Sequence, residues 1–383
     1  MTDLVHGMSN DLVASDWPAI TTGEVRDVLD HYSWISDEPG AAHVVWRSPR
    51  PMSAAVVARR ATTSVFVKRH HVKVRSRARL IQEHEFARHL RSRGAPVPAV
   101  LSTTSGESVV EHGDYVYEVH DASRGVDLYR DTPSWHPFSR VQHARSAGRA
   151  LAHLHRAARD FASPAWGPDV LVDSMAIVGD ADPAAALTQL VAQRRGLARS
   201  LERFDYQEDF SRWIVPAIKR ASPLVQELHP QWTHGDWHPS NLTWSTNEGD
   251  AAVSEILDLG LSNRTAAIRD IAIAIERTCV DWLDVKALGR VRSDVRFVDA
   301  LLDGYEEVSP LTRDENAALV ALLPVSHVEF ALSEVEYFAE VVHSDVNTAL
   351  AYEGFLLGHV RWFEGPDGAS LLEHLSAREV SRR

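Results

Sequence analysis

The chain has 383 residues, of which 44% are hydrophobic and 24% are charged. These values exclude a collagen-like or wholly disordered chain, and at about 150 residues per domain the length favours two domains or lobes. A single cysteine, Cys279, excludes an internal disulfide framework and a cysteine-based zinc cage. The opening residues lack a basic start followed by an apolar core, and no long apolar run occurs. We therefore expect a cytoplasmic protein with neither a secretory signal nor a membrane span.

The net charge of −13 is unevenly distributed along the chain. Residues 231–383 hold 26 Asp or Glu against 12 Lys or Arg, a net charge of −14, so the first 230 residues are nearly neutral. Within that neutral part, residues 59–93 are strongly basic. An acidic protein without a recognisable nucleic-acid fold is not expected to bind nucleic acid through this basic run.

The first third of the chain predicts a short helix and then a small sheet. Thr21 and Glu24 have the spacing of a capping box, so residues 1–30 form an extension with one short helix. Residues 31–119 form a first lobe, with a helix at 77–93 that ends at Gly94 before Pro96. Its strands are β-branched or aromatic runs bounded by turn residues, at 43–46, 54–59, 64–68, 108–111 and 115–119.

The remainder of the chain predicts mostly helices. We expect a hinge at 120–127 and a helical lobe at 128–383. The expected helices are 139–158, 183–201, 209–228, 268–278, 294–306 and a long pair over 326–363. A small antiparallel-sheet lobe followed by a large helical lobe is an α+β, bilobal arrangement.

The segment 232–260 carries the polar residues with the clearest chemical pattern. Two short apolar strands flank a polar turn at 245–250, which predicts a hairpin with Asp236, Asn241 and Asp258 at its ends. Asn241 is five residues after Asp236, and Asp258 begins the triplet Asp-Leu-Gly. Phosphoryl transfer requires such a set: a carboxylate that accepts the proton of the substrate hydroxyl, and an amide and a second carboxylate that hold Mg²⁺.

The first lobe supplies a lysine that completes this set. Lys68 ends the run Val-Phe-Val-Lys in a predicted strand, and a carboxylate on the next helix is expected to pair with it. Helical phase does not decide between Glu83 and Glu85; we favour Glu85. The segment 49–53 lacks glycine where a phosphate-covering loop is expected, so Ser53 or a nearby backbone N–H takes that role.

With these motifs the chain resembles the aminoglycoside phosphotransferase and choline kinase family, small-molecule kinases with a protein-kinase-like fold. The matching stretches are 65–68, 85–98, 150–155, 233–242, 256–260 and 269–272. The resemblance implies that Asp236 is the catalytic base, that Asn241 and Asp258 bind Mg²⁺ and that Lys68 binds phosphate. It also implies that Asp270 anchors the catalytic loop, which we expect His234 to hold by hydrogen bonds.

The resemblance further implies an ATP- or GTP-dependent phosphotransferase that acts on an alcohol group of a small molecule, with a role such as antibiotic resistance. Position 235 is Gly rather than the Arg of protein kinases, and no Ala-Pro-Glu follows, which argues against a protein substrate. The oligomeric state is left open.

Two other functions compete with this interpretation. His234, Asp236 and His238 alternate along the chain and could be ligands of a hydrolytic metal site. A pseudokinase or scaffold that binds nucleotide without turnover is the second alternative; loss of the base, a metal ligand or the lysine would favour it, and none is lost.

The acidic part of the chain suggests the class of acceptor. Glu329, Glu336 and Glu340 border an apolar stripe at helical spacing, and from 329 to 353 there are acids but no Lys or Arg. These glutamates are either acceptor-binding residues or part of a solvated helix face. In the first case we expect a small cationic acceptor, attracted by the negative field of this region.

Overall fold

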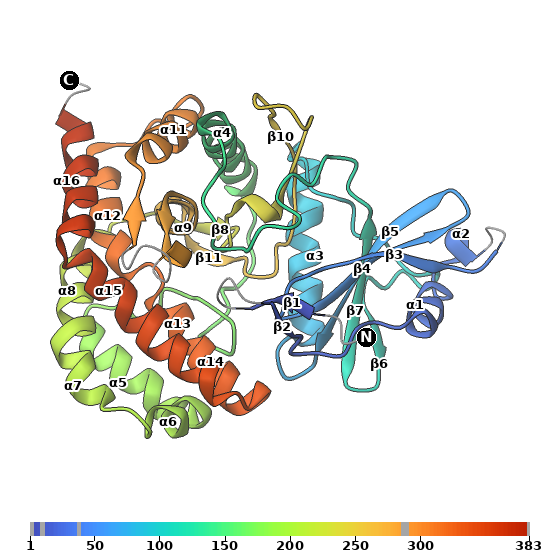
Figure 1. The fold of residues 1–383 in the computed structure, drawn as a ribbon, viewed down its shortest axis with the longest axis horizontal. Helices are drawn as coiled ribbons and strands as arrows, with labels where there is room; N and C mark the ends of the chain where they lie inside the picture. Colours follow the sequence, from blue (N-terminus) through green and yellow to red (C-terminus); the bar gives the residue numbers. More distant parts are fainter. Residues whose placement is uncertain (1–3, 8–11, 37–39, 285–290, 381–383) are drawn as a thin grey trace. The chain divides into compact units, whose positions relative to one another are not determined.

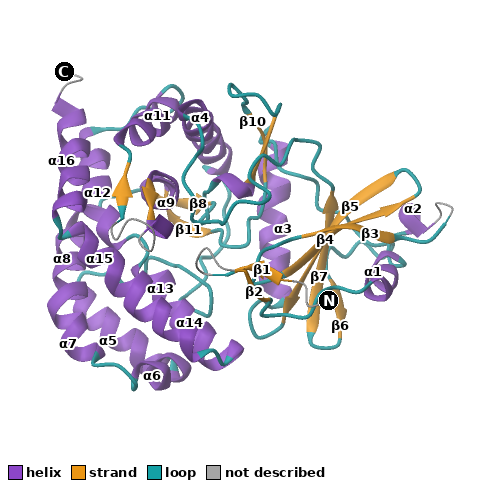
Figure 2. Ribbon diagram, viewed as in Figure 1, coloured by secondary structure: helices purple, strands orange, loops and turns teal. Residues whose placement is uncertain are grey.

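The computed structural model describes residues 4–7, 12–36, 40–284 and 291–380. The chain forms two compact units, which we call unit 1 and unit 2 (Figure 1). Unit 1 comprises Met1–Pro133 and Ser240–Gly260, and unit 2 comprises Ser134–Pro239 and Leu261–Arg383. Unit 1 contains a sheet, whereas unit 2 is mainly helical (Figure 2). The predicted α+β class is therefore confirmed.

Unit 1 is built on a five-stranded antiparallel sheet with the order β3-β4-β5-β7-β6. The strands are β3 (His43–Arg47), β4 (Ala54–Arg60), β5 (Thr63–His71), β6 (Val110–His112) and β7 (Tyr115–Asp121). One long helix, α3 (Arg77–Ser92), follows β5. The serine at position 76 caps this helix by accepting a hydrogen bond from the Arg79 backbone N–H.

The two faces of this sheet carry different side chains, because successive residues of a strand point to opposite faces. In β5, Val65 and Val67 belong to a buried apolar cluster that also contains residues of the first helix, α1 (Thr22–Leu29). Lys68 alternates with them and is paired in register with Glu118 of β7. His84 of α3 contacts Glu118, so α3 covers the second face. Charged and histidine side chains therefore gather under α3.

The N-terminal segment packs against the apolar face. It contains a hairpin of β1 (Leu4–His6) and β2 (Leu12–Ala14), which the sequence did not predict, followed by α1 (Thr22–Leu29) and α2 (Ser33–Ser36). The capping box at α1 is confirmed: Thr21 Oγ1 accepts a hydrogen bond from the Glu24 N–H at 3.1 Å, and Glu24 Oε2 accepts one from the Thr21 N–H at 2.8 Å.

The predicted hairpin after the polar motif also forms, as part of unit 1. β9 (Leu242–Trp244) pairs antiparallel with β10 (Val253–Ile256). The Leu257 N–H donates to the Asn241 carbonyl at 2.8 Å and so extends the pairing to the base of the hairpin.

Unit 2 consists mainly of helices, with short strand pairs. The helices are α4 (Val141–Ala158), α5 (Pro183–Gln193), α6 (Arg195–Leu201), α7 (Tyr206–Asp209), α8 (Val215–Val225), α9 (Ala267–Cys279), α11 (Val295–Glu306), α12 (Arg313–Leu322), α13 (Val328–Glu336), α14 (Asp345–Ala349), α15 (His359–Phe363) and α16 (Pro366–Val380). The π-helical segments η1 (Phe210–Ile214), η5 (Tyr337–Val342) and η6 (Leu350–Gly358) interrupt the helices predicted at 209–228 and 326–363. The strand pairs are β8 (Pro230–Thr233) with β11 (Asn263–Ala266) and β12 (Val280–Asp281) with β13 (Arg292–Ser293).

Helices α4 and α11 pack so closely that their backbones are in contact. A Cβ atom on Gly148 of α4 would lie 1.9 Å from the Leu301 carbonyl oxygen, and one on Gly304 of α11 would lie 1.9 Å from the Arg145 carbonyl oxygen. Both positions therefore require glycine. The close approach also sets the position of His155, which lies near the end of α4.

One helical stretch, Arg313–Val342, is long and apolar enough to cross a membrane by length and composition. However, 83% of its apolar window is buried inside the protein. The helical core of unit 2 accounts for this apolar character.

Candidate functional site

Lys68 and Asp258 form a close ion pair in unit 1. Lys68 Nζ lies 2.7 Å from both carboxylate oxygens of Asp258. Burial alone would lower the pKa of the Lys68 ammonium, but Asp258 and Glu118 together raise it above its usual value. Lys68 is therefore a fully charged donor, and 38% of the Asp258 side chain remains exposed.

The base of the β9–β10 hairpin brings Asn241 and Asp258 to the same end. Asn241 precedes β9, Asp258 follows β10, and the Leu257–Asn241 hydrogen bond joins the two segments. Asp258 has a φ of 53°, a left-handed conformation that is uncommon for a residue with a side chain. Its Oδ1 accepts the Gly260 N–H at 3.1 Å, which stabilises this turn.

Lys68, Asn241 and Asp258 all line a cavity of about 430 Å³ in unit 1. This volume suits a small organic ligand or a nucleotide. A carboxylate and an amide oxygen are the hard donors that Mg²⁺ takes. The donor set of Asn241 and Asp258 therefore fits a magnesium ion, and Lys68 beside it fits a phosphate group.

The segment before β4 contributes to the same cavity, but not at the residue that the sequence suggested. Ser48, Pro49 and Arg50 line it, whereas Ser53 is half-buried and is not among the described lining residues. The Arg50 guanidinium donates to the Thr132 carbonyl at 2.8 Å. Ser48, Pro49 and Arg50, rather than Ser53, are thus the residues by which this segment reaches the cavity.

The choice of Glu85 as the helix carboxylate is corrected by the structure. Glu85 is exposed on α3, whereas Glu83 is buried and lines the cavity with Lys68. Glu83 forms an ion pair with Arg75, which also donates to the Gly260 carbonyl. Burial raises the pKa of Glu83 to about 7, although Arg75 and Arg79 oppose this. Arg75 thereby connects α3 to the Asp-Leu-Gly turn.

This arrangement predicts a large loss of stability for one substitution on α3 and almost none for a neighbouring one. Glu83→Ala removes one partner of a buried ion pair, so we expect it to lower the free energy of unfolding by about 3–5 kcal/mol. Glu85→Ala, on the exposed face of the same helix, should change it by less than about 0.5 kcal/mol. Urea denaturation of both variants measures the difference. Equal effects would contradict the assignment of Glu83.

Asp270 holds the loop that follows β8 in unit 2 through hydrogen bonds to the loop backbone. The N–H groups of His234 and Gly235 donate to the two oxygens of Asp270 at 2.6 and 2.7 Å. Gly235 has a φ of 81°, and a Cβ atom there would lie 2.1 Å from the Leu261 carbonyl oxygen. Glycine is therefore required at the position where protein kinases have Arg.

Asp270 is itself fixed by the α4–α11 pair. His155 Nε2 lies 3.0 Å from Asp270 Oδ2, and His155 Nδ1 lies 2.9 Å from the Tyr305 hydroxyl. Burial alone would raise the pKa of Asp270, but His155 and the loop N–H groups lower it, so the carboxylate stays ionised.

The hydrogen bonds of His234 argue against a metal site on this loop. The Asp236 N–H donates to His234 Nδ1 at 3.1 Å, so this nitrogen is not available to a metal ion.

The Asp236 side chain is paired with Arg277 of α9. Arg277 Nη1 lies 2.6 Å from Asp236 Oδ1, and His238 Nε2 lies 3.4 Å from Asp236 Oδ2. Burial alone would raise the pKa of Asp236, but Arg277 and His238 hold it well below its usual range. The Arg277 guanidinium lies over the Trp135 ring at 4.0 Å. Asp236 is thus ionised, oriented and 17% exposed.

The ion pair predicts a change in pH dependence when Arg277 is replaced. In Arg277→Gln the pKa of Asp236 should rise, because the guanidinium that lowers it is gone and the raising effect of burial remains. If Asp236 is a base, kcat/KM of this variant should fall roughly tenfold for each pH unit below the new pKa, while the parent stays flat. Profiles between about pH 5 and pH 8 measure this. Arg264→Gln, at an exposed position of β11, is the control; parallel profiles would contradict the assignment.

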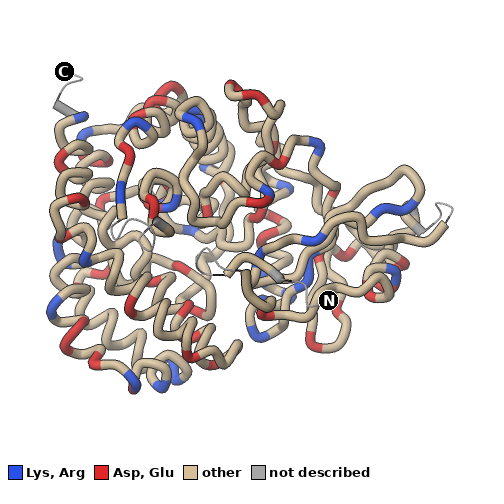
Figure 3. Tube along the Cα trace, in the orientation of Figure 1, with Lys and Arg blue, Asp and Glu red and all other residues tan. Residues whose placement is uncertain are grey.

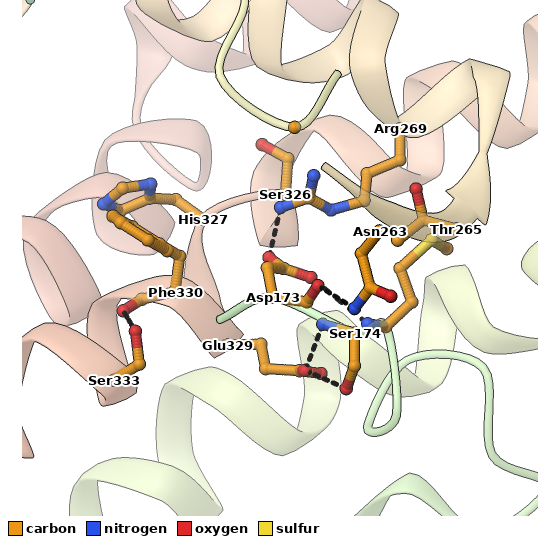
Figure 4. A network of polar contacts seen from close by, with 12 residues as sticks. Asp173, Ser174, Asn263, Thr265, Arg269, Ser326, His327, Glu329, Phe330 and Ser333 are labelled. Atoms are coloured by element: carbon orange, nitrogen blue, oxygen red, sulfur yellow. Dashed lines mark hydrogen bonds and ion pairs between the residues drawn. The ribbon is translucent and has the colours of Figure 1, made fainter. Parts of the chain in front are cut away.

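The three glutamates expected to attract the acceptor are occupied by partners within unit 2. Glu329 accepts hydrogen bonds from the Ser174 N–H at 2.6 Å and from the Ser174 hydroxyl (Figure 4). Burial and the nearby Asp173 raise the pKa of Glu329 to about 7. Glu336 pairs with Arg194, and Glu340 with Arg199. These contacts take up the three carboxylates within unit 2, and the role of the glutamates in acceptor binding stays a prediction.

The acidic surplus is also smaller when charge is counted by unit. Unit 2 contains 32 Asp or Glu and 24 Lys or Arg, because the four acids of residues 240–260 belong to unit 1 and residues 134–239, with 11 acids and 12 bases, are nearly neutral. Figure 3 shows both signs interspersed along the helices of unit 2. Ion pairs between residues far apart in the sequence, such as Arg203–Asp345 and Arg220–Glu364, connect the two segments. Charge alone therefore does not select a cationic acceptor.

Comparison with known proteins shows the family and the fold. Residues 49–315 match the model of the phosphotransferase enzyme family. A homoserine kinase of Methylobacillus glycogenes is 26% identical over 259 residues, which is 64% of this chain. The match covers 65% of that relative, so the chain spans just under two thirds of its length.

Several solved structures resemble most of this chain, and two of them illustrate the likeness. The microcompartment-associated aminopropanol kinase superposes with a TM-score of 0.56 at 15% identity, covering 91% of this chain and 99% of that one. An amicoumacin kinase in complex with AMP-PNP, Ca²⁺ and Ami superposes with a TM-score of 0.56 at 13% identity, covering 88% of this chain and 91% of that one. At these identities the likeness shows the fold, which confirms the kinase-like architecture predicted from the motifs.

Proposed function

Since the chain belongs to the phosphotransferase enzyme family, we propose that it transfers the γ-phosphoryl group of a nucleoside triphosphate to a hydroxyl group of a small molecule. The observation that carries this proposal is the cavity of unit 1, where Lys68, Asn241 and Asp258 line one space. A cation ligand set beside a charged lysine is the arrangement that a magnesium–triphosphate complex requires.

In this proposal Asn241 and Asp258 hold Mg²⁺, and the ion would neutralise charge on the phosphate oxygens. Lys68, which contacts Asp258 in the structure, turns to the phosphates when a nucleotide is present. Arg50 lines the same cavity and offers a second positive group from the segment before β4. The amicoumacin kinase is in complex with an ATP analogue and Ca²⁺, which supports the choice of ATP and a hard divalent cation.

Asp236 is the proposed base. Its ionised carboxylate accepts the proton of the acceptor hydroxyl, Arg277 orients it, and Asp270 holds the loop that carries it. A strongly lowered pKa makes Asp236 a weak base. This suits a loose transition state, in which little charge develops on the attacking oxygen before transfer.

For the acceptor we propose a small amino alcohol. The relatives that support this are named homoserine kinase and aminopropanol kinase, and both names denote substrates in which a hydroxyl group and an amine lie a few bonds apart. The paired states of Glu329, Glu336 and Glu340 argue that the amine is recognised by other groups.

An ADP-release assay tests the proposal. The panel contains homoserine, aminopropanol, larger amino alcohols and aminoglycosides, each with ATP or GTP and with or without Mg²⁺. We expect Mg²⁺-dependent ADP release above the acceptor-free rate for at least one amino alcohol. Nucleotide binding without acceptor-stimulated turnover across the panel would instead indicate a nucleotide-binding pseudokinase.

A further inference from the structure

Three histidines surround one buried carboxylate in unit 1. Glu118 of β7 is contacted by His84 Nε2 at 2.9 Å, by His120 Nε2 at 2.7 Å and by His70 Nε2 at 2.9 Å. Glu118, His84 and His70 are buried, and His120 is partly buried. The ligand atoms of His84, Glu118 and His120 all lie within 4.8 Å of one another.

The local fold brings these groups together from separate elements. Glu118 and His120 are two residues apart on β7 and therefore point to the same face of the sheet. His84 lies on the buried side of α3, which covers this face. The Nε2 atoms of His84 and His120 both face the Glu118 carboxylate, and an imidazole nitrogen is the commonest protein ligand of transition metals.

The geometry is close to that of a metal centre. Zinc bonds to histidine nitrogen and carboxylate oxygen are about 2.0–2.2 Å long, so a tetrahedral site separates its ligand atoms by about 3.3 Å. His84 and His120 both contact the same oxygen, Glu118 Oε2, at 2.9 and 2.7 Å. These contacts need to open by only about half an ångström to admit the ion.

We propose that His84, Glu118 and His120 form a binding site for a divalent transition-metal ion, with Zn²⁺ as the preferred occupant. The neighbouring groups hold the ligands in orientation: Ser108 Oγ lies 2.9 Å from His84 Nδ1, and His70 occupies the other oxygen of Glu118. All three ligands line the cavity of unit 1, so the fourth coordination position is open to it.

This site differs from the proposed magnesium site in ligand chemistry. Two imidazole nitrogens and one carboxylate favour zinc and similar ions, whereas Mg²⁺ prefers oxygen ligands such as Asn241 and Asp258. Zinc binding therefore does not depend on the proposed kinase activity, and excess Mg²⁺ fills the oxygen site without competing for the histidines.

Calorimetric titration of the chelator-treated full chain with Zn²⁺, in excess Mg²⁺, tests the proposal. We expect one tight site per chain, and a Co²⁺ complex with the absorption of a four-coordinate ion. His120→Gln and Glu118→Gln should each weaken Zn²⁺ binding by more than about 100-fold, and Ser108→Ala by about tenfold. His112→Gln, at an exposed position of β6, is the matched control and should bind as the parent does.

Thermal unfolding with and without Zn²⁺ gives a second measurement, because an ion that binds only the folded chain raises the midpoint. His120 is partly exposed, so its variant is expected to fold, and its midpoint without zinc checks this. Absence of a tight site in the parent would overturn the proposal. So would parental affinity and an unchanged thermal shift in His120→Gln, which would leave the cluster as a hydrogen-bonded network.

Discussion

Asp236→Asn should lower kcat by about 10²- to 10⁴-fold while the affinity for nucleotide stays near the parental value. The amide has nearly the same shape as the carboxylate but cannot accept the hydroxyl proton. The contacts that we assign to the nucleotide come from unit 1, whereas Asp236 belongs to unit 2. Steady-state kinetics with the best acceptor, together with calorimetric titration of nucleotide, measures both effects.

The control for this variant is Asp250→Asn, at an exposed position in the turn between β9 and β10. It makes the same chemical change in the same segment and should leave kcat and nucleotide affinity unaltered. If Asp236→Asn kept a near-parental kcat, Asp236 would have to be reassigned as a residue that holds the loop through Arg277.

Lys68→Met and Asp258→Ala should each abolish most turnover and weaken nucleotide binding, in contrast to Asp236→Asn. We assign to Lys68 the charged hydrogen bonds to phosphate, and each such bond contributes about 1.5–3 kcal/mol, or about 10- to 100-fold in affinity. Loss of Asp258 removes the carboxylate that we assign to Mg²⁺. Its variant should therefore bind nucleotide equally with and without Mg²⁺, whereas the parent should bind more tightly with Mg²⁺.

Lys73→Met is the matched control for Lys68, because Lys73 is an exposed lysine of the same basic segment. It should bind nucleotide as the parent does. Mg²⁺-dependent nucleotide binding that survives Asp258→Ala would contradict the metal assignment. Unchanged affinity in Lys68→Met would contradict the phosphate assignment.

The parts of the site that could be predicted from sequence are those carried by local pattern. Asn241 and Asp258 flank two short apolar strands, and strand pairing across a turn is a local event that alternation and turn residues reveal. The capping box at Thr21 is equally local. The family match covers the same motifs and confirms the kinase-like fold that they predicted.

The sequence-based predictions failed for helix residues whose burial depends on segments far away along the chain. The choice between Glu83 and Glu85 depends on which side of α3 meets the sheet, and Arg75, which pairs with Glu83, carries no distinctive signal in the basic run. Glu329 borders the apolar stripe of a helix, and the stripe alone does not reveal whether another segment covers that border. The backbone around Ser174 covers that border in the structure.

The sequence also did not reveal functional residues whose partners lie far away along the chain. Arg277 lies 41 positions after Asp236 and is recognised as its partner only when α9 packs beside the loop. The Glu-x-His pair at 118 and 120, with His84 on a helix, contains metal-binding residue types at strand spacing. This signal could have been noticed, but it gains meaning only when α3 is placed over β7.

We infer that this chain moves a phosphoryl group from ATP to a hydroxyl group of a small amino alcohol. Mass spectrometry of the acceptor after incubation with γ-¹⁸O-labelled ATP and Mg²⁺ tests it most directly. We predict a labelled phosphate ester on the acceptor hydroxyl with the parent chain and with Asp250→Asn, and almost none with Asp236→Asn. Label found only in inorganic phosphate, or equal ester formation by the parent and Asp236→Asn, would contradict the claim.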